Sequence, residues 1–370
     1  MPRIVHLSSV HPTFDTRIFS KECRTLVAAG YQVVLVTTHP KDEVVDGVQI
    51  KAIAFPKNRL ERIFVTVWRL YRRAVSLHGD LYHFHDPELL PVGVMLRFRG
   101  KKVIYDAHEN VPKVLMSKSW LHPLVRWPVS VVMSIIERVS VAFFTGVVAA
   151  TPPIARRFPS RKTVVVQNYP RVSEFQLVAE DKGLERSTAW ICYVGGITAG
   201  RGALEMVRAI GLMDSGYNAR LRLAGPIRQK GLENQMRCSL GWERTDLLGW
   251  LERPQIAALF SRSAAGLVVL HPERNHIESQ PNKLFEYMSA GLPVIASDFP
   301  LWREIIDGVG CGILVDPLDP QAISEAMTWI FQNPRQAREM GVRGRRAVQD
   351  IYHWEKESEK LLQFYKRVFT

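Results

Sequence analysis

The sequence has few cysteines, and no two of them are closely spaced. The four cysteines stand far apart along the 370 residues: Cys23, Cys192, Cys238 and Cys311. Zinc sites and disulfide frameworks use cysteines at short, recurring spacings. The sequence therefore favours neither kind of site, and we expect four buried free thiols.

Long apolar runs are also missing. No stretch of about 18 uninterrupted apolar residues occurs, so no membrane-spanning helix is predicted. The chain begins Met-Pro-Arg-Ile-Val-His-Leu, which leads into a strand pattern without the basic segment, apolar core and cleavage site of a secretory signal. We therefore expect a cytoplasmic location.

Acidic residues are scarce in the first half only. Residues 1–170 contain 24 Lys and Arg against 12 Asp and Glu, whereas the remainder contains 25 against 24. Nearly all of the formal net charge of +13 thus belongs to the first half. This asymmetry favours an anionic partner for that half, either nucleic acid or an acidic membrane surface.

Apolar, β-branched segments alternate with helical patterns in both halves. The first half has predicted strands at residues 3–10, 31–37, 81–85, 103–106, 146–149 and 163–167. The second half has them at residues 190–195, 220–224, 245–248, 266–270, 293–297 and 312–315. Predicted helices include 21–29, 203–213, 253–261 and 283–290. Strands that alternate with helices indicate parallel, doubly wound α/β sheets.

The length of the chain exceeds one ordinary core, so two domains are expected. We predict a Rossmann-like acceptor domain over residues 1–170 and a Rossmann-like donor domain over 171–350. A helix over 351–370 would pack back toward the first domain. The charged segment 171–187 suits a linker. The two domains would face each other across a cleft, and ligands would bind beyond the carboxyl ends of the strands.

The most informative segment starts at Glu278 and reads Glu278-Ser-Gln-Pro-Asn-Lys-Leu-Phe-Glu286. The amides that begin the helix there, together with Lys283, can hold a diphosphate. Glu286 can accept hydrogen bonds from ribose hydroxyls, as acidic residues do in dinucleotide folds. The alternative is that both glutamates lie on a solvated helix face.

This segment resembles the Glu-x7-Glu motif of retaining glycosyltransferase family 4, a family with the GT-B fold. Upstream, Tyr193-Val-Gly-Gly-Ile-Thr-Ala-Gly-Arg201-Gly is similar to the family's glycine loop, in which an Arg and a Lys clamp the diphosphate. Gly196 stands at the Arg position and Arg201 at the Lys position. One usual cation is therefore missing, and Lys283 is the candidate to replace it. Alternatively, Arg201 is a surface cation that pairs loosely with Glu205.

The resemblance covers nearly the whole chain and implies a nucleotide-sugar site in the second half. The base would lie near Gly225, Trp250 and Leu251, and Glu278 would contact the transferred sugar. The donor-binding residues implied by the resemblance are Gly195, Gly196, Arg201, Gly225, Trp250, Leu251, Ser279, Asn282, Lys283, Leu284 and Glu286.

Ionisable residues follow two predicted strands of the first half, where α/β folds build sites. His108 comes after one strand, and His85 with Asp86 ends the other. The family commonly has a His near the reacting sugar, and His108 is the position that corresponds to it. Its imidazole would contact the donor sugar or orient the acceptor hydroxyl. Each of these histidines also has a structural alternative.

Asp15 and Arg17 occupy the first strand-to-helix loop, where the family often has glycines. Arg17 could meet an anionic acceptor or a donor phosphate. Equally, Asp15 or Thr16 could cap the helix and leave Arg17 exposed.

The resemblance implies retention by front-face substitution, in which the leaving diphosphate accepts the proton of the acceptor hydroxyl. The expected catalytic residues are His108, Glu278, Arg201 and Lys283. Arg201 and Lys283 would stabilise the departing diphosphate. No Asp-x-Asp motif stands in a suitable loop, so this interpretation requires no metal and no cofactor besides the nucleotide-sugar, with a UDP-sugar favoured and a GDP-sugar as the alternative.

Two segments of the first half suggest contact with lipid. Residues 59–77 form a basic helix with an apolar stripe at positions 60, 63, 64, 67, 71, 74 and 75. Such helices usually pack on their own sheet. Residues 120–136 add aromatic and apolar bulk suited to shallow insertion. We expect peripheral binding to anionic lipids at the inner face of the membrane, consistent with a lipid-linked acceptor.

The predicted function is transfer of a hexosyl-type sugar from a nucleotide-sugar to a glycan or lipid-linked acceptor in cell-surface polysaccharide or glycolipid synthesis. Two alternatives stay open. One is a nucleotide-sugar epimerase or phosphorylase of the same fold. The other is a basic nucleic-acid-binding protein, which is disfavoured because no recognition motif occurs.

Overall fold

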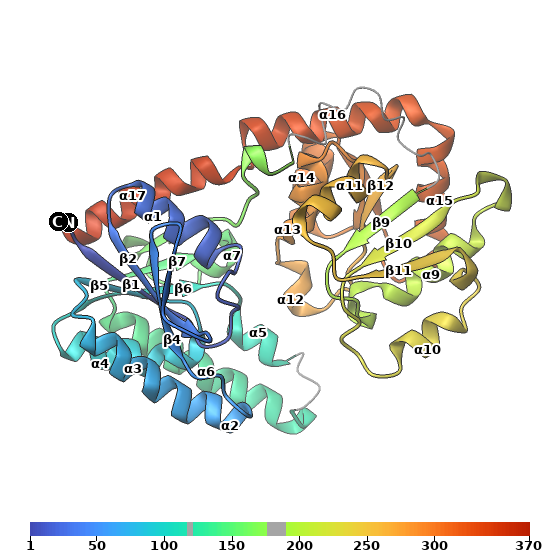
Figure 1. Ribbon diagram of the computed structural model, residues 1–370. Helices are drawn as coiled ribbons and strands as arrows, with labels where there is room; N and C mark the ends of the chain where they lie inside the picture. Colours follow the sequence, from blue (N-terminus) through green and yellow to red (C-terminus); the bar gives the residue numbers. More distant parts are fainter. Residues whose placement is uncertain (117–120, 176–189) are drawn as a thin grey trace. The chain divides into compact units, whose positions relative to one another are not determined.

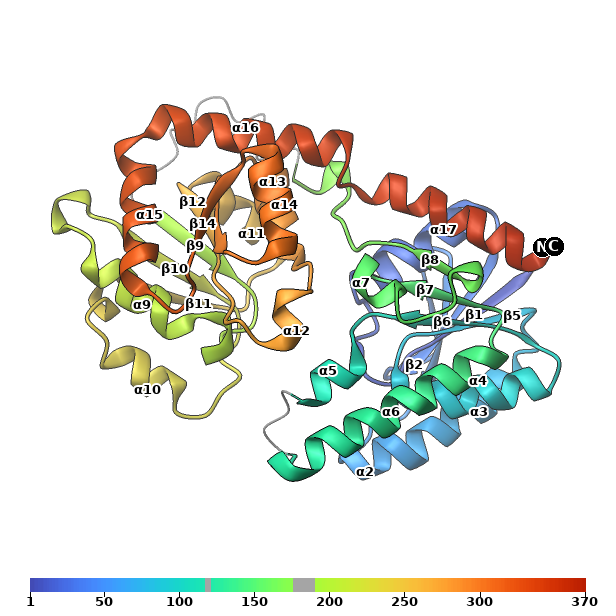
Figure 2. The same ribbon diagram turned by 180° about the vertical axis from the view of Figure 1, so that it is seen from behind.

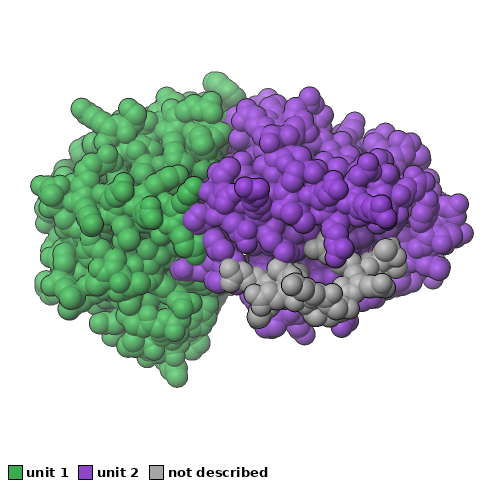
Figure 3. Space-filling view, turned by 90° about the horizontal axis from the view of Figure 1, so that it is seen from above, with its two compact units in different colours: residues 1–168, 354–370 green, residues 169–353 purple. Residues whose placement is uncertain are grey.

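A computed structural model describes residues 1–116, 121–175 and 190–370 (Figure 1). The chain divides into two compact units, one formed by residues 1–168 with 354–370 and the other by residues 169–353 (Figure 3). Most of the expected linker, 171–187, lies outside the described residues, as does Trp120.

The first unit is built on an eight-stranded sheet with the order β3-β4-β2-β1-β5-β6-β7-β8. All neighbouring strands are parallel except β3 and β4, which are antiparallel. The strands are β1 (Arg3–Leu7), β2 (Gln32–Thr38), β3 (Glu43–Val45), β4 (Val48–Ile53), β5 (Leu81–Phe84), β6 (Lys102–Ala107), β7 (Gly146–Ala149) and β8 (Thr163–Val165).

Helices cover both faces of this sheet (Figure 2). One layer contains α2 (Arg59–Glu61), η2 (Arg62–Thr66), α3 (Val67–Ser76), α4 (Leu90–Phe98) and α6 (Pro123–Phe143). The other contains the π-helical turn η1 (Ile18–Cys23), α1 (Arg24–Ala28) and the C-terminal helix α17 (Trp354–Phe369). The shorter elements are η3 (Pro87–Leu89), α5 (Val111–Met116), α7 (Pro152–Ala155) and η4 (Ser160–Lys162).

Side chains along the central strands alternate between the two faces. On β1 and β5, Val5, Leu7, Tyr82 and Phe84 pack in the core under α3 and α4. Ile4 and Leu81 face the opposite core, which contains side chains of η1, α1 and α17. Because residues two apart share a face, His6 and His83 also point toward η1 and α17.

The second unit has a six-stranded, fully parallel sheet with the order β11-β10-β9-β12-β13-β14. Its strands are β9 (Trp190–Val194), β10 (Arg220–Ala224), β11 (Thr245–Gly249), β12 (Ala265–Val268), β13 (Val294–Ser297) and β14 (Gly312–Val315). Its helices are η5 (Val172–Phe175), η6 (Ala199–Arg201), α9 (Ala203–Leu212), η7 (Ser215–Tyr217), α10 (Leu232–Arg237), η8 (Trp242–Arg244), α11 (Arg253–Ser261), α12 (Arg274–Ile277), α13 (Asn282–Ser289), α14 (Pro300–Val309), α15 (Pro320–Gln332) and α16 (Pro334–Asp350). One core lies under α9, α10 and α15, and the other under α11, α13 and α14.

The predicted fold class, two Rossmann-like units with parallel sheets, is confirmed. Two details of the sequence interpretation are wrong: the hairpin β3–β4 was not expected, and Cys238 is exposed rather than buried. The apolar stripe of residues 59–77 is divided between core and surface. Tyr71 and Ala74 of the stripe are buried, whereas Leu60 and Phe64 are 69% and 68% exposed.

Candidate functional site

Two glycine loops meet at the carboxyl ends of β9 and β10 in the second unit. Gly195 and Gly225 have φ angles of +134° and +140°, a region that strongly favours glycine. A Cβ atom on Gly225 would lie 2.1 Å from the carbonyl oxygen of Gly195. The two loops therefore approach each other as closely as backbone permits, and they can do so only as glycines.

Three cationic side chains surround Gly195 and Gly196. A Cβ atom on Gly195 would lie 3.1 Å from Lys283 Nζ, and one on Gly196 would lie 3.1 Å from Arg201 Nη1 and 3.4 Å from Arg228 Nε. Arg201 Nη1 donates to the Gly196 carbonyl at 3.2 Å. The side chain of Arg228 is exposed and makes no hydrogen bond or ion pair within the described part of the chain. Sequence reasoning missed Arg228, since nothing in its own segment marks it.

Lys283 sits in an environment that opposes its charge. Its ammonium lies 3.9 Å from the ring centroid of Tyr193, and burial together with the nearby Arg201 lowers its pKa well below the ordinary range. Glu286 offsets this effect only in part. Cations held close together without a matching anion form a site that an anionic ligand would stabilise.

Glu286, on helix α13, is half-buried and does not point into solvent. Its Oε1 accepts from Arg253 Nη1 at 2.8 Å, and Arg253 also pairs with Glu174 at 2.8 Å. The Oε2 atom of Glu286 has no hydrogen bond from the described residues. Glu286 therefore has one oxygen fixed by the protein and one left for a further donor.

Glu278 and its neighbours form the short connection before α13. Glu278 caps the carboxyl end of α12 and is half-buried. The hydroxyl of Ser279 donates to the carbonyl of His276, and its own carbonyl accepts from the Trp302 indole at 2.7 Å. These bonds fix the connection on the core, and Asn282 begins α13 directly after it.

The structure places three further residues of the expected donor site as follows. The side chain of Leu284 is fully buried, and its backbone amide already donates to the carbonyl of Pro281, so neither group is open to a nucleotide-sugar. Trp250 is 72% exposed, and its indole donates to Glu252 at 3.2 Å. Leu251 packs partly against the core.

The surface ion pair suggested between Arg201 and Glu205 does not form. Glu205 is buried and lies 3.0 Å from His271 Nε2. Arg201 is turned toward the glycine loop instead.

In the first unit, Asp106 near the carboxyl end of β6 contacts the side chains of His85, His108 and Arg17. His108 Nε2 lies 2.7 Å from Asp106 Oδ2, and His85 Nδ1 lies 3.1 Å from the same oxygen. Burial raises the pKa of Asp106, but the charge of Arg17 and the contacts with the histidines outweigh it, so the net pKa is well below the usual range. His108 keeps 16% of its side chain exposed, whereas His85 is buried with its pKa lowered to about 4, chiefly by desolvation.

Arg17 fulfils neither of the two roles expected from sequence. It is 3% exposed, and its guanidinium holds Asp106 with two bonds of 2.8 and 3.0 Å. Its Nε also lies 3.1 Å from Glu22 Oε1. Arg17 is neither a surface cation nor open to a phosphate, because the unit encloses it between two carboxyl groups.

Asp86 and Asp15 organise loops. Asp86 is buried, accepts from the amide of Ser9 at 2.6 Å and lies 2.9 Å from His11 Nδ1. Asp15 Oδ1 accepts from the amides of Arg17 and Ile18, where η1 begins. Both aspartates therefore shape the loop after β1, and Asp86 in particular has no free face for an acceptor.

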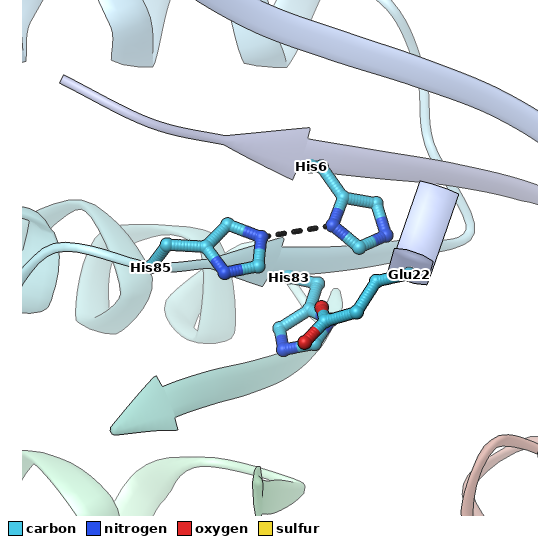
Figure 4. A group of neighbouring side chains, drawn as sticks. All are labelled: His6, Glu22, His83 and His85. Atoms are coloured by element: carbon cyan, nitrogen blue, oxygen red, sulfur yellow. Dashed lines mark hydrogen bonds and ion pairs between the residues drawn. The ribbon is translucent and has the colours of Figure 1, made fainter. Parts of the chain in front are cut away.

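Sequence reasoning also missed His6, Glu22 and His83, which lie close to His85 (Figure 4). His6 Nδ1 is 2.9 Å from His85 Nε2. The signal was the pattern Tyr82-His-Phe-His85, since residues two apart on a strand share a face. His6 and Glu22 could not be added without knowing that β1 pairs with β5.

Two family descriptions match the chain and together cover most of it. Glycosyl transferases group 1 matches residues 149–347, and Glycosyltransferase Family 4 matches residues 19–168. The first match alone spans more than half of the chain.

Curated relatives carry related names. Phosphatidyl-myo-inositol mannosyltransferase of Mycobacterium leprae is 25% identical over 333 residues, which is 86% of this chain and 83% of that protein. D-rhamnosyltransferase WbpZ of Pseudomonas aeruginosa is 32% identical over 119 residues. That second match covers 32% of this chain and only 30% of the rhamnosyltransferase.

Solved structures share the fold over the full length. Sucrose-phosphate synthase from Thermosynechococcus elongatus has a TM-score of 0.80 at 19% identity, covering 100% of this chain and 99% of that one. HepE of Anabaena in complex with UDP-glucose has a TM-score of 0.73 at 13% identity, covering 99% and 100%. With the family matches, the two parallel sheets and the glycine loops, these similarities establish that the chain belongs to glycosyltransferase family 4 and is a glycosyltransferase of the GT-B fold.

Proposed function

We propose that the second unit binds the diphosphate of a nucleotide-sugar and that the enzyme transfers the sugar, with retention, to a glycan or lipid-linked acceptor. One observation carries the proposal: Lys283, Arg201 and Arg228 converge on Gly195 and Gly196 at the carboxyl end of β9. Ligands of parallel α/β sheets bind beyond that end. Glycine backbone and several cations suit a polyanionic group.

Arg228 supplies the cation that the glycine loop lacks at position 196. The family pattern places an arginine at that position, and the space beside Gly196 is here occupied by Arg228 and Arg201. A guanidinium can hold a phosphate with two parallel hydrogen bonds, whereas Lys283 acts as a point charge. The proposed clamp therefore contains two arginines and one lysine.

The remaining groups of the second unit would hold the rest of the donor. The Oε2 atom of Glu286 would accept from a ribose hydroxyl while Arg253 fixes Oε1. Glu278 would contact hydroxyls of the transferred sugar. A uracil base is favoured because the HepE neighbour binds UDP-glucose, and a GDP-sugar is the alternative.

We assign acceptor binding to the first unit. His108 is its partly exposed titratable group at the end of β6, and Asp106 orients the imidazole through Nε2. In front-face substitution the leaving diphosphate accepts the acceptor proton, so the protein acts mainly by position and charge. His108 would orient the acceptor hydroxyl or the donor sugar.

A lipid surface is proposed as the setting for the acceptor. No described helix is long and apolar enough to span a membrane. Helix α6 nevertheless exposes a stripe of apolar side chains at intervals of three or four residues: Leu124, Trp127, Val131, Ile135, Val139 and Phe143. Exposed Arg138 on the same helix would favour anionic headgroups. Cell-surface polysaccharide or glycolipid synthesis at the inner face of the membrane would fit this arrangement.

The activity is tested by incubating the full chain with UDP-, GDP- and ADP-sugars and lipid-linked acceptors. Release of nucleoside diphosphate together with a glycosylated product supports the proposal, provided that NMR shows the anomeric configuration of the donor in the product. A rearranged donor without transfer would indicate an epimerase. Sugar phosphate formed only when inorganic phosphate is added would indicate a phosphorylase. A product of inverted configuration would contradict the proposed mechanism.

A further inference from the structure

Four side chains with metal-binding groups meet inside the first unit. His6 comes from β1, His83 lies on β5, His85 directly follows it, and Glu22 comes from η1. One ligand atom from each lies within 4.8 Å of the others (Figure 4). Their exposed fractions are 0% for three of them and 1% for His85.

The cluster contains buried polar atoms without hydrogen-bond partners. Glu22 Oε2 accepts no hydrogen bond from the described residues, and His83 Nε2 makes none either. His83 Nδ1 lies 3.9 Å from Glu22 Oε2 and is hydrogen-bonded to the Tyr365 hydroxyl at 2.6 Å, so Nε2 is the nitrogen of His83 that has no partner. Polar groups left unsatisfied in a core destabilise the folded state. A ligand that binds the carboxylate would remove part of this cost.

The neighbouring carboxylate fixes the tautomer of His85 in the form that a metal ligand needs. Asp106 accepts from His85 Nδ1 at 3.1 Å, so the lone pair of His85 lies on Nε2. That nitrogen faces His6 Nδ1 at 2.9 Å. A histidine whose second nitrogen donates to a carboxylate is the usual arrangement around protein-bound metals. Asp106 itself is held by Arg17 and stays outside the cluster.

We propose that His6, Glu22, His83 and His85 bind one divalent transition-metal cation, with Zn²⁺ the best match, as a structural ion of the first unit. Three imidazoles and one carboxylate form a four-coordinate ligand set without thiolates. Bond lengths of about 2.0–2.1 Å place tetrahedral ligand atoms roughly 3.3 Å apart. The ring nitrogens of His6 and His85, now 2.9 Å apart, would therefore separate slightly, and the ligand atoms that are up to 4.8 Å apart would close around the ion.

Binding at this cluster has a definite proton balance. Glu22 coordinates only as the carboxylate, so any proton on its carboxyl group leaves when the metal binds. If His6 coordinates through Nδ1, its own proton moves to Nε2, which lies 3.5 Å from the Tyr365 hydroxyl. The ion would tie β1, β5 and η1 together, and because the ligands are buried it would not meet substrate.

The alternative is a neutral hydrogen-bonded network, and Glu22→Gln separates the two. Glutamine has the size of a protonated glutamic acid and can replace it in a network, but it does not supply the anionic ligand. His83→Gln is the second test variant. His122→Gln is the matched control, since His122 is exposed and lies outside the cluster.

The experiment uses the untagged full chain, grown with added Zn²⁺ or Co²⁺, purified by gel filtration and analysed for metal. We expect about one ion per chain in the wild type and in His122→Gln, and less than about a tenth of that in the two test variants. A chelator should lower the melting temperature of the wild type but not that of Glu22→Gln. In the Co²⁺ form, intense visible absorption typical of four-coordinate cobalt is expected.

Three results would overturn the proposal. The first is a metal-free wild type whose melting temperature is unchanged by Zn²⁺ or Co²⁺. The second is equal metal content in Glu22→Gln and the wild type. The third applies if neither test variant folds: weak absorption typical of six-coordinate cobalt in the wild type would then place the ion elsewhere.

Discussion

At the scale of single residues, the proposed diphosphate clamp depends most on Gly196 and Arg228. Gly196 leaves room for the side chain of Arg228 beside the glycine loop. The sequence alone could not predict that an arginine after β10 would stand in for the one missing after β9. Positions 196 and 228 become neighbours only when β9 pairs with β10.

Replacing Arg228 by Ala should weaken UDP binding roughly ten- to hundredfold, because a hydrogen bond to a charged group contributes about 1.5–3 kcal/mol. Isothermal titration measures the change, and binding of uridine should not respond. Lys230→Ala, an exposed cation nearby, is the control. Adding Gly196→Arg to Arg228→Ala should restore part of the affinity. Equal affinity of Arg228→Ala and the wild type would exclude Arg228 from the clamp.

The lowered pKa of Lys283 predicts how UDP binding depends on pH. In the free protein its pKa is lowered by burial and by Arg201, and a bound diphosphate favours the charged form. Binding should therefore take up a proton, and the affinity for UDP should fall as the pH rises between the lowered pKa of the free protein and the higher pKa of the complex. Titrations in buffers of different ionisation enthalpy measure the uptake, which Lys283→Met should abolish. Proton release would refute this account.

At the scale of elements, short strands that lie between helices in the chain were predicted well. Segments such as β7 and β10 are short apolar or alternating runs between helices, and their bounds agree with the expected ranges. The hairpin β3–β4 was missed because it lies at the sheet edge, where Val48–Ile53 mixes exposed and buried positions. Edge strands have weaker apolar patterns than central ones.

The contact between the loops after β9 and β10 predicts the effect of Gly225→Ala. The new Cβ would collide with the Gly195 carbonyl, and φ of +140° is strained for alanine. We expect a loss of at least about 1–3 kcal/mol in unfolding free energy, measured by urea denaturation, and weaker UDP binding. Gly308→Ala, in α14 with open space around it, should be neutral or stabilising. A fully stable Gly225→Ala would contradict the described contact.

Helix α6 predicts lipid binding. Ile135 and Val139 are 56% and 55% exposed, so Ile135→Ser combined with Val139→Ser should leave folding intact while reducing flotation with anionic liposomes roughly tenfold. The control is Val342→Ser on α16 of the second unit, where Val342 is 61% exposed. Flotation that is independent of anionic lipid, or unaffected by the double change, would remove the lipid surface from the proposal.

At the scale of the whole molecule, the sequence was sufficient to predict the fold class and to single out the glycine and Glu-x7-Glu segments. Each of these predictions rests on patterns that are local in the chain. The buried network of the first unit was not foreseeable. Its members His6, Glu22, His83 and Asp106 are scattered along the first 106 residues and meet only through the strand order β1-β5-β6. Arg17 was misjudged for the same reason, since its partner Asp106 is 89 residues away.

The central claim is that a nucleoside diphosphate binds the second unit between its glycine loops and α13. Hydrogen exchange of the full chain with and without UDP tests it most directly, since bound ligand slows the opening of the segments that it contacts. The account predicts protection of residues 194–202, 225–230 and 282–287, with little change in β1, β5 and β6. Protection confined to the first unit, or none at saturating UDP, would contradict it.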